Sequence, residues 1–220
     1  KKNGKLRFVI DARRSNQMFV RPPSTVLGST AAVCEVECGE ETIYFSGQDV
    51  ADCFYQFAIP DWMSGLFGLK DVLAKDVGTT SIDGRAVSPD TRIVPCLSVL
   101  PMGFSWALHF TQECHRKLLE DAGLGPPSTE MVDRHPAPRL DALLPAKLVY
   151  VDNEVFVSNR PEAVVNARVI AHHHMTKMGL PMHDIVEQSA FIEAIDLELD
   201  GVKHTARLGH TKRWRLHFGI

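Results

Sequence analysis

The sequence lacks an apolar run long enough to cross a membrane. A spanning helix needs about 20 consecutive apolar residues, and no run in this 220-residue chain comes near that length. A charged start followed by an apolar stretch, which would indicate a secretory signal, is also missing. We therefore expect no membrane contact and an intracellular protein, cytoplasmic or nuclear, that is not secreted. Because the first residue is Lys and not Met, we interpret the sequence as a segment of a longer polypeptide.

Cysteines are few and follow no pairing pattern. There are five, and no two form a CxxC motif. This argues against a disulfide framework and favours a reducing compartment. Cys34 and Cys38 are four residues apart, but the neighbouring sequence offers no further zinc ligands. His172–His174 are expected to be surface histidines, because successive residues of a helix point in different directions.

Charge of one sign does not dominate, since the formal net charge is only -3. This argues against a simple basic clamp for nucleic acid. The distribution is nevertheless uneven. Residues 1–21 carry seven basic side chains and one acidic, residues 201–220 carry five basic and none acidic, and the residues between them have a net charge of -14. An acidic centre between two basic ends is typical of a site in which carboxylates hold a metal ion while the neighbouring basic segments contact phosphates. The alternative is an unevenly charged solvated surface.

Two segments, 104–122 and 161–178, carry apolar residues at helical spacing. A glycine follows each of them and can end a helix there. Residues 15–40 and 125–145 contain prolines and show no period, so we expect irregular structure, with 125–145 as a surface loop.

Strands are expected mainly in pairs, because runs of β-branched and aromatic residues are separated by turn residues. The strand segments are 5–11 after an Asn3–Gly4 turn, 42–59 passing into a compact turn, short pieces within 66–100, 147–157 turning at Asp152–Asn153, and 190–208 turning at Asp200–Gly201. This order of hairpins and helices predicts an α+β fold with antiparallel pairing.

Two aspartates, Asp49 and Asp152, stand where a strand ends in a turn. Turns between paired strands can converge even when they are far apart in sequence. One or two carboxylates together with substrate phosphates usually hold Mg²⁺, and a two-ion site can clamp both oxygens of a phosphoryl displacement. The alternative is that Asp152–Asn153 is only a hairpin turn, since both residue types are favoured there for backbone reasons.

Five segments together narrow the function. They are Arg7–Asn16, Asp49–Gln56, Leu100–Ala107, Tyr150–Asn153, and Phe191–Glu193 ahead of Asp200–Gly201. In order and approximate spacing they resemble the motif series of reverse transcriptases, and the resemblance extends from Lys1 to about residue 208. It implies the fingers and palm of a right-hand polymerase, with an antiparallel palm sheet backed by helices, from a retrotransposon or retrovirus-like element.

The resemblance also implies a division of the chain. The parts are a fingers segment at 1–45, palm at 46–60, fingers hairpins at 61–99, palm at 100–208 with a loop insertion at about 125–145, and the start of a truncated connection at 209–220. A thumb and the rest of the connection would then lie outside this segment. RNase H and integrase domains are candidates for the full polyprotein.

By the same resemblance, the catalytic residues are Asp49, Asp152 and Asn153. Asp49 and Asp152 match the family's two principal metal-binding aspartates, and Val50 would lend a backbone carbonyl to one of two Mg²⁺ ions, with Mn²⁺ as an alternative. The family usually has a second adjacent aspartate where this chain has Asn153. An amide keeps an oxygen ligand but loses a negative charge, so metal affinity or preference is expected to shift.

The resemblance further assigns residues to the nucleotide and the primer. Nucleotide contacts are expected from Arg7, Lys2, Asp52, Phe54, Met102 and Gly103, and the primer grip from Phe191, Ile192 and Glu193. The ring of Phe54 would overlap a ribose 2′-hydroxyl, which favours deoxyribonucleotides. The family's lysine that is proposed to protonate pyrophosphate has no counterpart here. His183 is the nearest titratable donor and a candidate general acid, and a solvated loop histidine is the alternative.

These inferences predict an RNA-directed DNA polymerase, a nucleotidyltransferase. The 3′-hydroxyl of a primer would attack the α-phosphate of a dNTP, with two divalent metals, on an RNA or DNA template. Two other functions remain as alternatives. One is a catalytically silent nucleic-acid-binding relic of a retroelement, in which Asn153 would mark decay. The other is an RNA-dependent RNA polymerase with the same palm, which Phe54 disfavours.

Overall fold

The computed structural model describes residues 10–140 and 143–209. The strand expected at 5–11 and its turn fall almost entirely outside these residues, as do Lys2 and Arg7. No helix in the described ranges is both long and apolar enough to span a bilayer.

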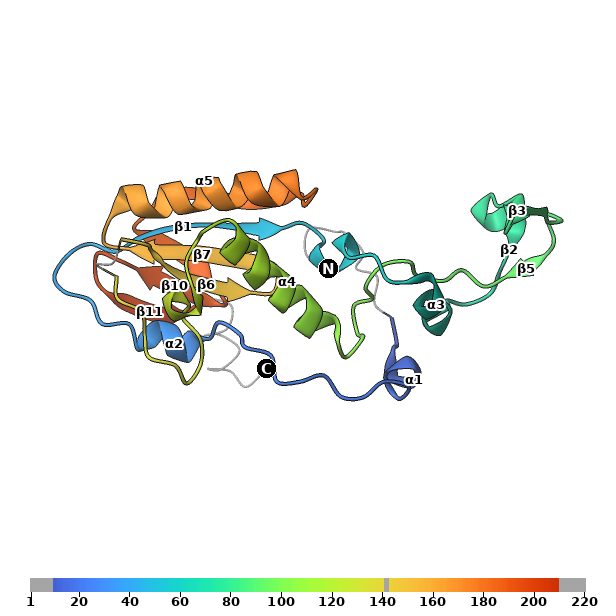
Figure 1. The fold of residues 1–220 in the computed structure, drawn as a ribbon, viewed down its shortest axis with the longest axis horizontal. Helices are drawn as coiled ribbons and strands as arrows, with labels where there is room; N and C mark the ends of the chain where they lie inside the picture. The colour runs from blue at the N-terminus through green and yellow to red at the C-terminus, as the bar shows by residue number, and fades with distance from the viewer. Residues whose placement is uncertain (1–9, 141–142, 210–220) are drawn as a thin grey trace. The chain divides into compact units, whose positions relative to one another are not determined.

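Residues distant in sequence join to form each of two compact units (Figure 1). The first consists of Lys1–Pro22 and Phe54–Ala107, and the second of Pro23–Cys53 and Leu108–Ile220. The chain therefore leaves the second unit after Cys53 and returns to it at Leu108.

The second unit is built on a four-stranded antiparallel sheet in the order β6-β7-β1-β8. Its strands are β1 (Tyr44–Val50), β6 (Ala146–Tyr150), β7 (Asn153–Ser158) and β8 (Met182–Ser189). A smaller sheet contains β9 (Phe191–Ala194), β10 (Leu197–Asp200) and β11 (Thr205–Leu208). The helices are α2 (Thr30–Cys34), α4 (Ala107–Asp121), which starts at the unit boundary, α5 (Pro161–Lys177) and the 3-10 turn η4 (Pro127–Thr129).

Strands β6 and β7 of the four-stranded sheet are buried on both faces, which explains the apolar runs in their sequences. Val149 and Phe156 face helices α4 and α5 and pack with their buried side chains. Leu148 and Val155, their neighbours in sequence, point to the opposite face and pack with β9 and β10. The sheet thus lies between the two long helices and the smaller sheet (Figure 1).

Both predicted helices are confirmed, as α4 and α5. Gly123 and Gly179 follow them with φ of +77° and +85°, the left-handed conformation in which helices commonly end. The buried apolar side chains of α5 recur at helical spacing, as the sequence predicts: Val164, Ala167, Ala171 and Met175.

The segment 190–199 is not the single strand that the sequence predicts. It forms β9 and β10, joined by a turn at Ile195 and Asp196 with φ of +42° and +68°. The turn contains no glycine or asparagine, so the alternating pattern continues through it without a break. The sequence also predicts no strand at 182–189. In the structure, β8 forms there and pairs with β1 through the backbone, although most of its side chains are exposed.

Two segments expected to be irregular are more ordered than predicted. Within 125–145, Met131 and Leu140 are buried in the core of the second unit, so this segment is not simply a surface loop. Within 15–40, α2 forms because the Ser29 hydroxyl accepts a hydrogen bond from the Ala32 N–H (3.1 Å) and caps the helix.

The first unit consists of short elements. They are α1 (Arg13–Asn16), η1 (Cys53–Gln56) at the unit boundary, α3 (Asp61–Ser64), η2 (Gly65–Phe67), β2 (Val72–Leu73), η3 (Ala74–Val77), β3 (Ser81–Ile82), β4 (Arg85–Ala86) and β5 (Arg92–Ile93). β2 pairs with β5 and β3 with β4, which confirms the hairpins expected within 66–100. Its core includes Phe104, whose ring meets those of Phe19 and Phe67 edge-on at centroid distances of 4.9 and 5.2 Å.

Candidate functional site

Asp49 lies near the end of β1, between two neighbouring strands. It is paired with Asn153 of β7 on one side and with His183 of β8 on the other. Directly opposed residues of antiparallel strands point to the same face of a sheet, so these three side chains gather around one point. The N–H of Val50 donates to the backbone carbonyl of Asp152 at 2.8 Å. The end of β1 and the β6-β7 turn are therefore adjacent.

A bulge in β8 lies beside Asp49. Gly47 and Asp49 are two residues apart on β1, but their partners Val186 and His183 are three apart on β8. Asp184, inside the bulge, has a φ of +49°. A bulge of this kind redirects side chains. Ligand atoms of Asp49, His183 and Asp184 all lie within 4.8 Å of one another. His183 thus lies on a strand and not in the loop that the sequence suggests.

The negative charges around Asp49 are incompletely compensated. Burial raises the pKa of Asp49 above its ordinary value, the hydrogen bond from Asn153 opposes this rise, and the charge of Asp152 adds to it. Asp152 itself has an exposed side chain and does not belong to the Asp49 group among the described residues. Such a concentration of negative charge favours the binding of a cation.

Asn153 connects the β6-β7 turn to Asp49. Its Nδ2 donates a hydrogen bond to the Asp49 carboxylate. Its buried Oδ1 has no hydrogen-bond partner within the described part of the chain. A buried oxygen without a partner is costly, so a ligand at this oxygen would be favourable. Carboxylate and amide oxygens beside an imidazole fit a divalent cation such as Mg²⁺ or Mn²⁺.

The loop that carries Met102 and Gly103 contacts the segment around α1 within the first unit. Asn16 Nδ2 donates to the Gly103 carbonyl (3.0 Å), and Asn16 Oδ1 accepts from the Ser105 N–H (2.9 Å). Gly103 has a φ of +107°, and a Cβ there would lie 2.8 Å from the Ile10 carbonyl oxygen. The first and third motifs of the sequence therefore meet, and the close approach explains the glycine.

The predicted site residues are distributed over both units. Asp49, Val50, Asp52, Asp152, Asn153, His183 and Phe191–Glu193 belong to the second unit, and Phe54, Met102 and Gly103 to the first. Asp52 follows β1 with a φ of +48°, and its side chain is exposed. In β9, Ile192 is buried while Phe191 and Glu193 are exposed, as the alternation of a strand requires.

Solved structures of foamy viral proteins are similar to this chain. The foamy viral protease-reverse transcriptase dRH in complex with ds DNA has a TM-score of 0.67 at 14% identity, and the match covers 99% of this chain and 31% of that one. The same kind of protein in complex with dsDNA has a TM-score of 0.64 at 13% identity, with 99% and 36% covered. The chain has a reverse transcriptase-like fold.

A third structure with the same fold is the foamy viral protease-reverse transcriptase in complex with RNA/DNA hybrid. Its TM-score is 0.57 at 12% identity, with 95% of this chain and 22% of that one covered. The chain therefore spans between about a fifth and just over a third of the length of these proteins. No protein-family model and no curated protein matches the sequence.

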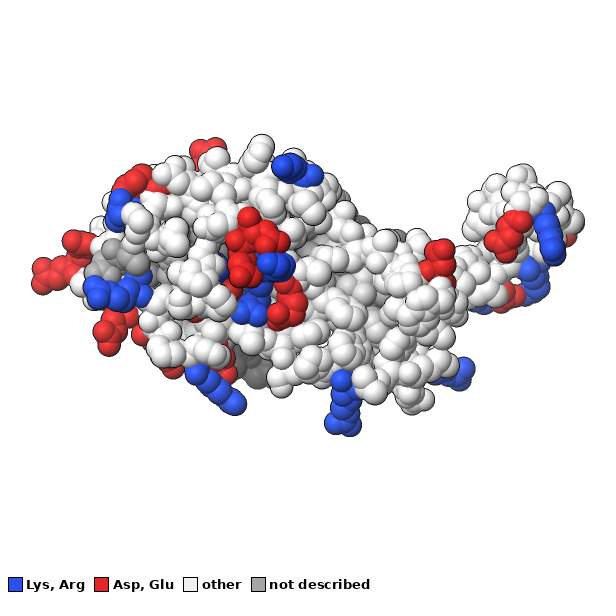
Figure 2. All heavy atoms as spheres, viewed as in Figure 1, with Lys and Arg blue, Asp and Glu red and all other residues white. Residues whose placement is uncertain are grey.

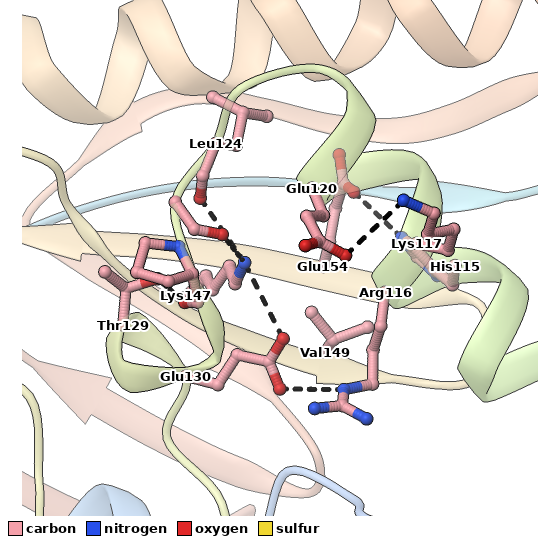
Figure 3. Close-up of polar contacts among 12 residues, drawn as sticks. His115, Arg116, Lys117, Glu120, Leu124, Thr129, Glu130, Lys147, Val149 and Glu154 are labelled. Atoms are coloured by element: carbon pink, nitrogen blue, oxygen red, sulfur yellow. Dashed lines mark hydrogen bonds and ion pairs between the residues drawn. The ribbon is translucent and has the colours of Figure 1, made fainter.

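Helix α4 of this reverse transcriptase-like fold carries polar residues that the sequence analysis missed. Gln112 and His115 are buried and reach the backbone of β6 and the following turn. His115 also lies 2.8 Å from the carboxylate of Glu154, the residue after Asn153 (Figure 3). One signal was available: Gln112, His115 and the buried Leu119 are spaced on one face of a helix whose apolar face packs on the sheet.

A second polar network, around Lys147 of β6, is also buried. The Lys147 ammonium donates to the carbonyls of Leu124 and Gly125 and lies 3.6 Å from Glu130, which in turn accepts from Arg116 of α4 (Figure 3). Nearby side chains of α4 form further ion pairs, and basic and acidic groups are mixed on the face shown in Figure 2. Because the charges of this network are paired, we assign it a structural role.

Proposed function

We propose that the chain forms fingers and palm of a reverse transcriptase and catalyses template-directed DNA synthesis from dNTPs on a primed RNA or DNA template. One observation carries the proposal. Within a reverse transcriptase-like fold, Asp49 lies between Asn153 and His183, next to the turn that bears Asp152. In this proposal the second unit is mainly palm, and the first unit supplies fingers.

The proposed reaction joins the primer 3′-oxygen to the α-phosphorus of the dNTP while the bond to pyrophosphate breaks. Magnesium ions held by Asp49, Asp152 and the Val50 carbonyl would favour ionisation of the 3′-hydroxyl and neutralise the triphosphate. Asp184 adds negative charge beside Asp49. His183 is the proposed proton donor to pyrophosphate.

The remaining residues of the proposal bind and orient substrates. Arg7 and Lys2 would contact the triphosphate, and Asp52, Phe54, Met102 and Gly103 would surround the nucleotide. Phe191, Ile192 and Glu193 would hold the primer end. Further domains of a polyprotein, including a thumb and a connection, and RNase H and integrase as candidates, would extend the grip on nucleic acid.

A catalytically silent nucleic-acid-binding protein is the second candidate function. It is favoured by Asn153, which removes one negative charge from the turn and already donates a hydrogen bond to Asp49. If that hydrogen bond outcompetes a metal ion, template and primer would bind without chemistry.

Primer extension separates the two candidates. The chain is incubated with a primed RNA template and dNTPs, with Mg²⁺ or with Mn²⁺, and template-primer binding is measured in parallel. We expect metal-dependent extension that Asp49→Asn or Asp152→Asn removes almost entirely, with binding of the template-primer retained. Asp121→Asn, the same change at the exposed end of α4, is the matched control and should extend normally. Binding without extension, with either ion, would favour the silent protein.

A further inference from the structure

The residue before Asp152 has an unfavourable backbone conformation. Val151 has a φ of +57°, and its side chain is buried. The left-handed region is a genuine outlier for a β-branched residue, so it persists only where surrounding contacts fix it. The direction in which the turn presents Asp152 and Asn153 therefore depends on those contacts.

Helix α4 holds both backbone polar groups of Val151. The Oε1 atom of Gln112 accepts a hydrogen bond from the Val151 N–H at 2.7 Å, and its Nε2 donates to the Val149 carbonyl at 3.1 Å. His115, one turn further along α4, brings Nδ1 to 2.8 Å from the Val151 carbonyl oxygen. Two side chains from one helix thus fix the turn from the interior of the unit.

His115 is itself fixed by a chain of buried partners. Its Nε2 lies 2.8 Å from Oε2 of Glu154, and Glu154 accepts a second hydrogen bond from Gln48 of β1. Gln48 in turn pairs with His172 of α5 at 2.9 Å. A carbonyl and a carboxylate both accept hydrogen bonds, so these two contacts favour an imidazolium that donates from both nitrogens.

The charge state of His115 agrees with this geometry. Burial lowers the pKa of His115, but the hydrogen bond and charge of Glu154, the Val151 carbonyl and the charge of Asp152 together outweigh burial, so the pKa is raised. The imidazolium and the Glu154 carboxylate are 3% and 0% exposed, and each compensates the buried charge of the other.

We propose that His115 is a positioning residue for the Asp152 turn, since the ring that Glu154 orients holds the Val151 carbonyl and thereby the direction of the Asp152 carboxylate. This inference rests on the proposed function, because it assigns His115 to the same metal site. His115 is buried, and its ring nitrogens contact Val151 and Glu154. Its effect is transmitted through the backbone of Val151, which is adjacent to Asp152 in sequence.

Two amide substitutions separate the two hydrogen bonds of His115. In His115→Asn the side-chain NH₂ reaches roughly the position of Nδ1 and can still donate to Val151. In His115→Gln the longer side chain reaches the position of Nε2 and can donate only to Glu154. Both variants are also made together with Glu154→Gln. In these double variants, the loss of the His115 ring leaves no unpaired Glu154 carboxylate in the interior.

The readouts are Mn²⁺ affinity by electron paramagnetic resonance, kcat for primer extension, template-primer Kd, and Tm. We expect His115→Gln to lower Mn²⁺ affinity and kcat by about 10- to 100-fold, with template-primer Kd unchanged. His115→Asn should stay within about threefold of the wild type in both quantities, a margin well below the effect expected for the other variant. The same difference is expected in the Glu154→Gln background.

The outcomes distinguish this inference from the proposed function. The positioning role would be overturned if both variants lost Mn²⁺ affinity and kcat equally and in proportion to their fall in Tm. It would also be overturned if His115→Gln were more active than His115→Asn. A wild-type chain that binds Mn²⁺ with an affinity dependent on Asp49 but does not extend primers would contradict the proposed function alone, and Mn²⁺ affinity would still test His115. Absence of Mn²⁺ binding in the wild type would overturn both.

Discussion

The charge of Asp49 destabilises the folded chain when no metal is bound. Its pKa is raised, so its ionised form is less favourable in the folded state than in the unfolded state. The associated loss of stability develops as pH rises from the ordinary pKa of 3.8 through the raised value, and it is fully present above that raised value. A divalent cation that binds only the folded state would reverse this loss.

Asp49→Asn tests this account. The amide removes the charge and keeps an oxygen that can accept from Asn153. In EDTA at neutral pH, we expect the Tm of the variant to rise by a few degrees. Added Mg²⁺ should raise the Tm of the wild type and leave that of the variant unchanged. A variant that melts below the wild type in EDTA, or that gains equally from Mg²⁺, would contradict the account.

Asn153→Asp should have the opposite effect. The substitution removes the hydrogen bond donated to Asp49 and adds a carboxylate beside it. We expect a lower Tm in EDTA, tighter Mg²⁺ binding, and a lower Mg²⁺ concentration for half-maximal extension. Thermal melts in EDTA measure the loss of stability, and metal titrations measure the gain in Mg²⁺ affinity. An unchanged metal titration would mean that the side chain only shapes the turn.

Single residues differ in how well the sequence reveals their role. Asp49 and Asp152 are candidates from the sequence because each lies where a strand gives way to a turn and belongs to a motif. Gln112 and His115 were not, because their role depends on contacts with a turn more than 30 residues away. The bulge that brings Asp184 to Asp49 has no sequence signal either, since its residue in a positive-φ conformation is an aspartate and not a glycine.

At the scale of elements, prediction succeeded where burial imposes a period. Helices α4 and α5 have one face against the sheet, and strands β6 and β7 are buried on both faces. It failed for β8, which is held by backbone pairing with β1 while most of its side chains are exposed. Without an apolar face, a strand leaves no alternation in the sequence to detect.

Two methionines at the end of α5 test the importance of its buried face. Met175 is fully buried against the sheet, whereas Met178, the last residue of the segment 161–178 predicted to be helical, is 59% exposed. We expect Met175→Ala to lower the free energy of unfolding by about 2–5 kcal/mol. Met178→Ala should change it by less than about 0.5 kcal/mol. Urea unfolding of both variants measures the difference, and equal effects would contradict the packing described for α5.

At the scale of the whole molecule, the order of the motifs predicted the fold better than any single motif. Solved structures with 12–14% identity share this fold, so few individual residues are required to maintain it. The motifs are distributed over both compact units, and each unit is formed from segments that are distant in sequence.

Under the proposed function, the choice of sugar decides whether the molecule makes DNA or RNA, and Phe54 of the first unit is the residue expected to make that choice. The Phe54 ring would fill the space that a 2′-hydroxyl of the incoming nucleotide needs. Phe54→Val removes this steric exclusion, so it should act chiefly on the disfavoured substrate. We expect the ratio of kcat/KM for dNTP over rNTP to fall by about 10-fold or more.

Phe57→Val provides a matched control for this change. Phe57 is also partly buried against the core of the first unit, so its loss should cost comparable packing without changing the choice of sugar. Both variants are measured on one primed RNA template, with Tm determined in parallel. A fall in the ratio for Phe54→Val alone would support DNA synthesis. An unchanged ratio, or the same fall in both variants, would mean that Phe54 does not select the sugar and would restore RNA synthesis as an equal alternative.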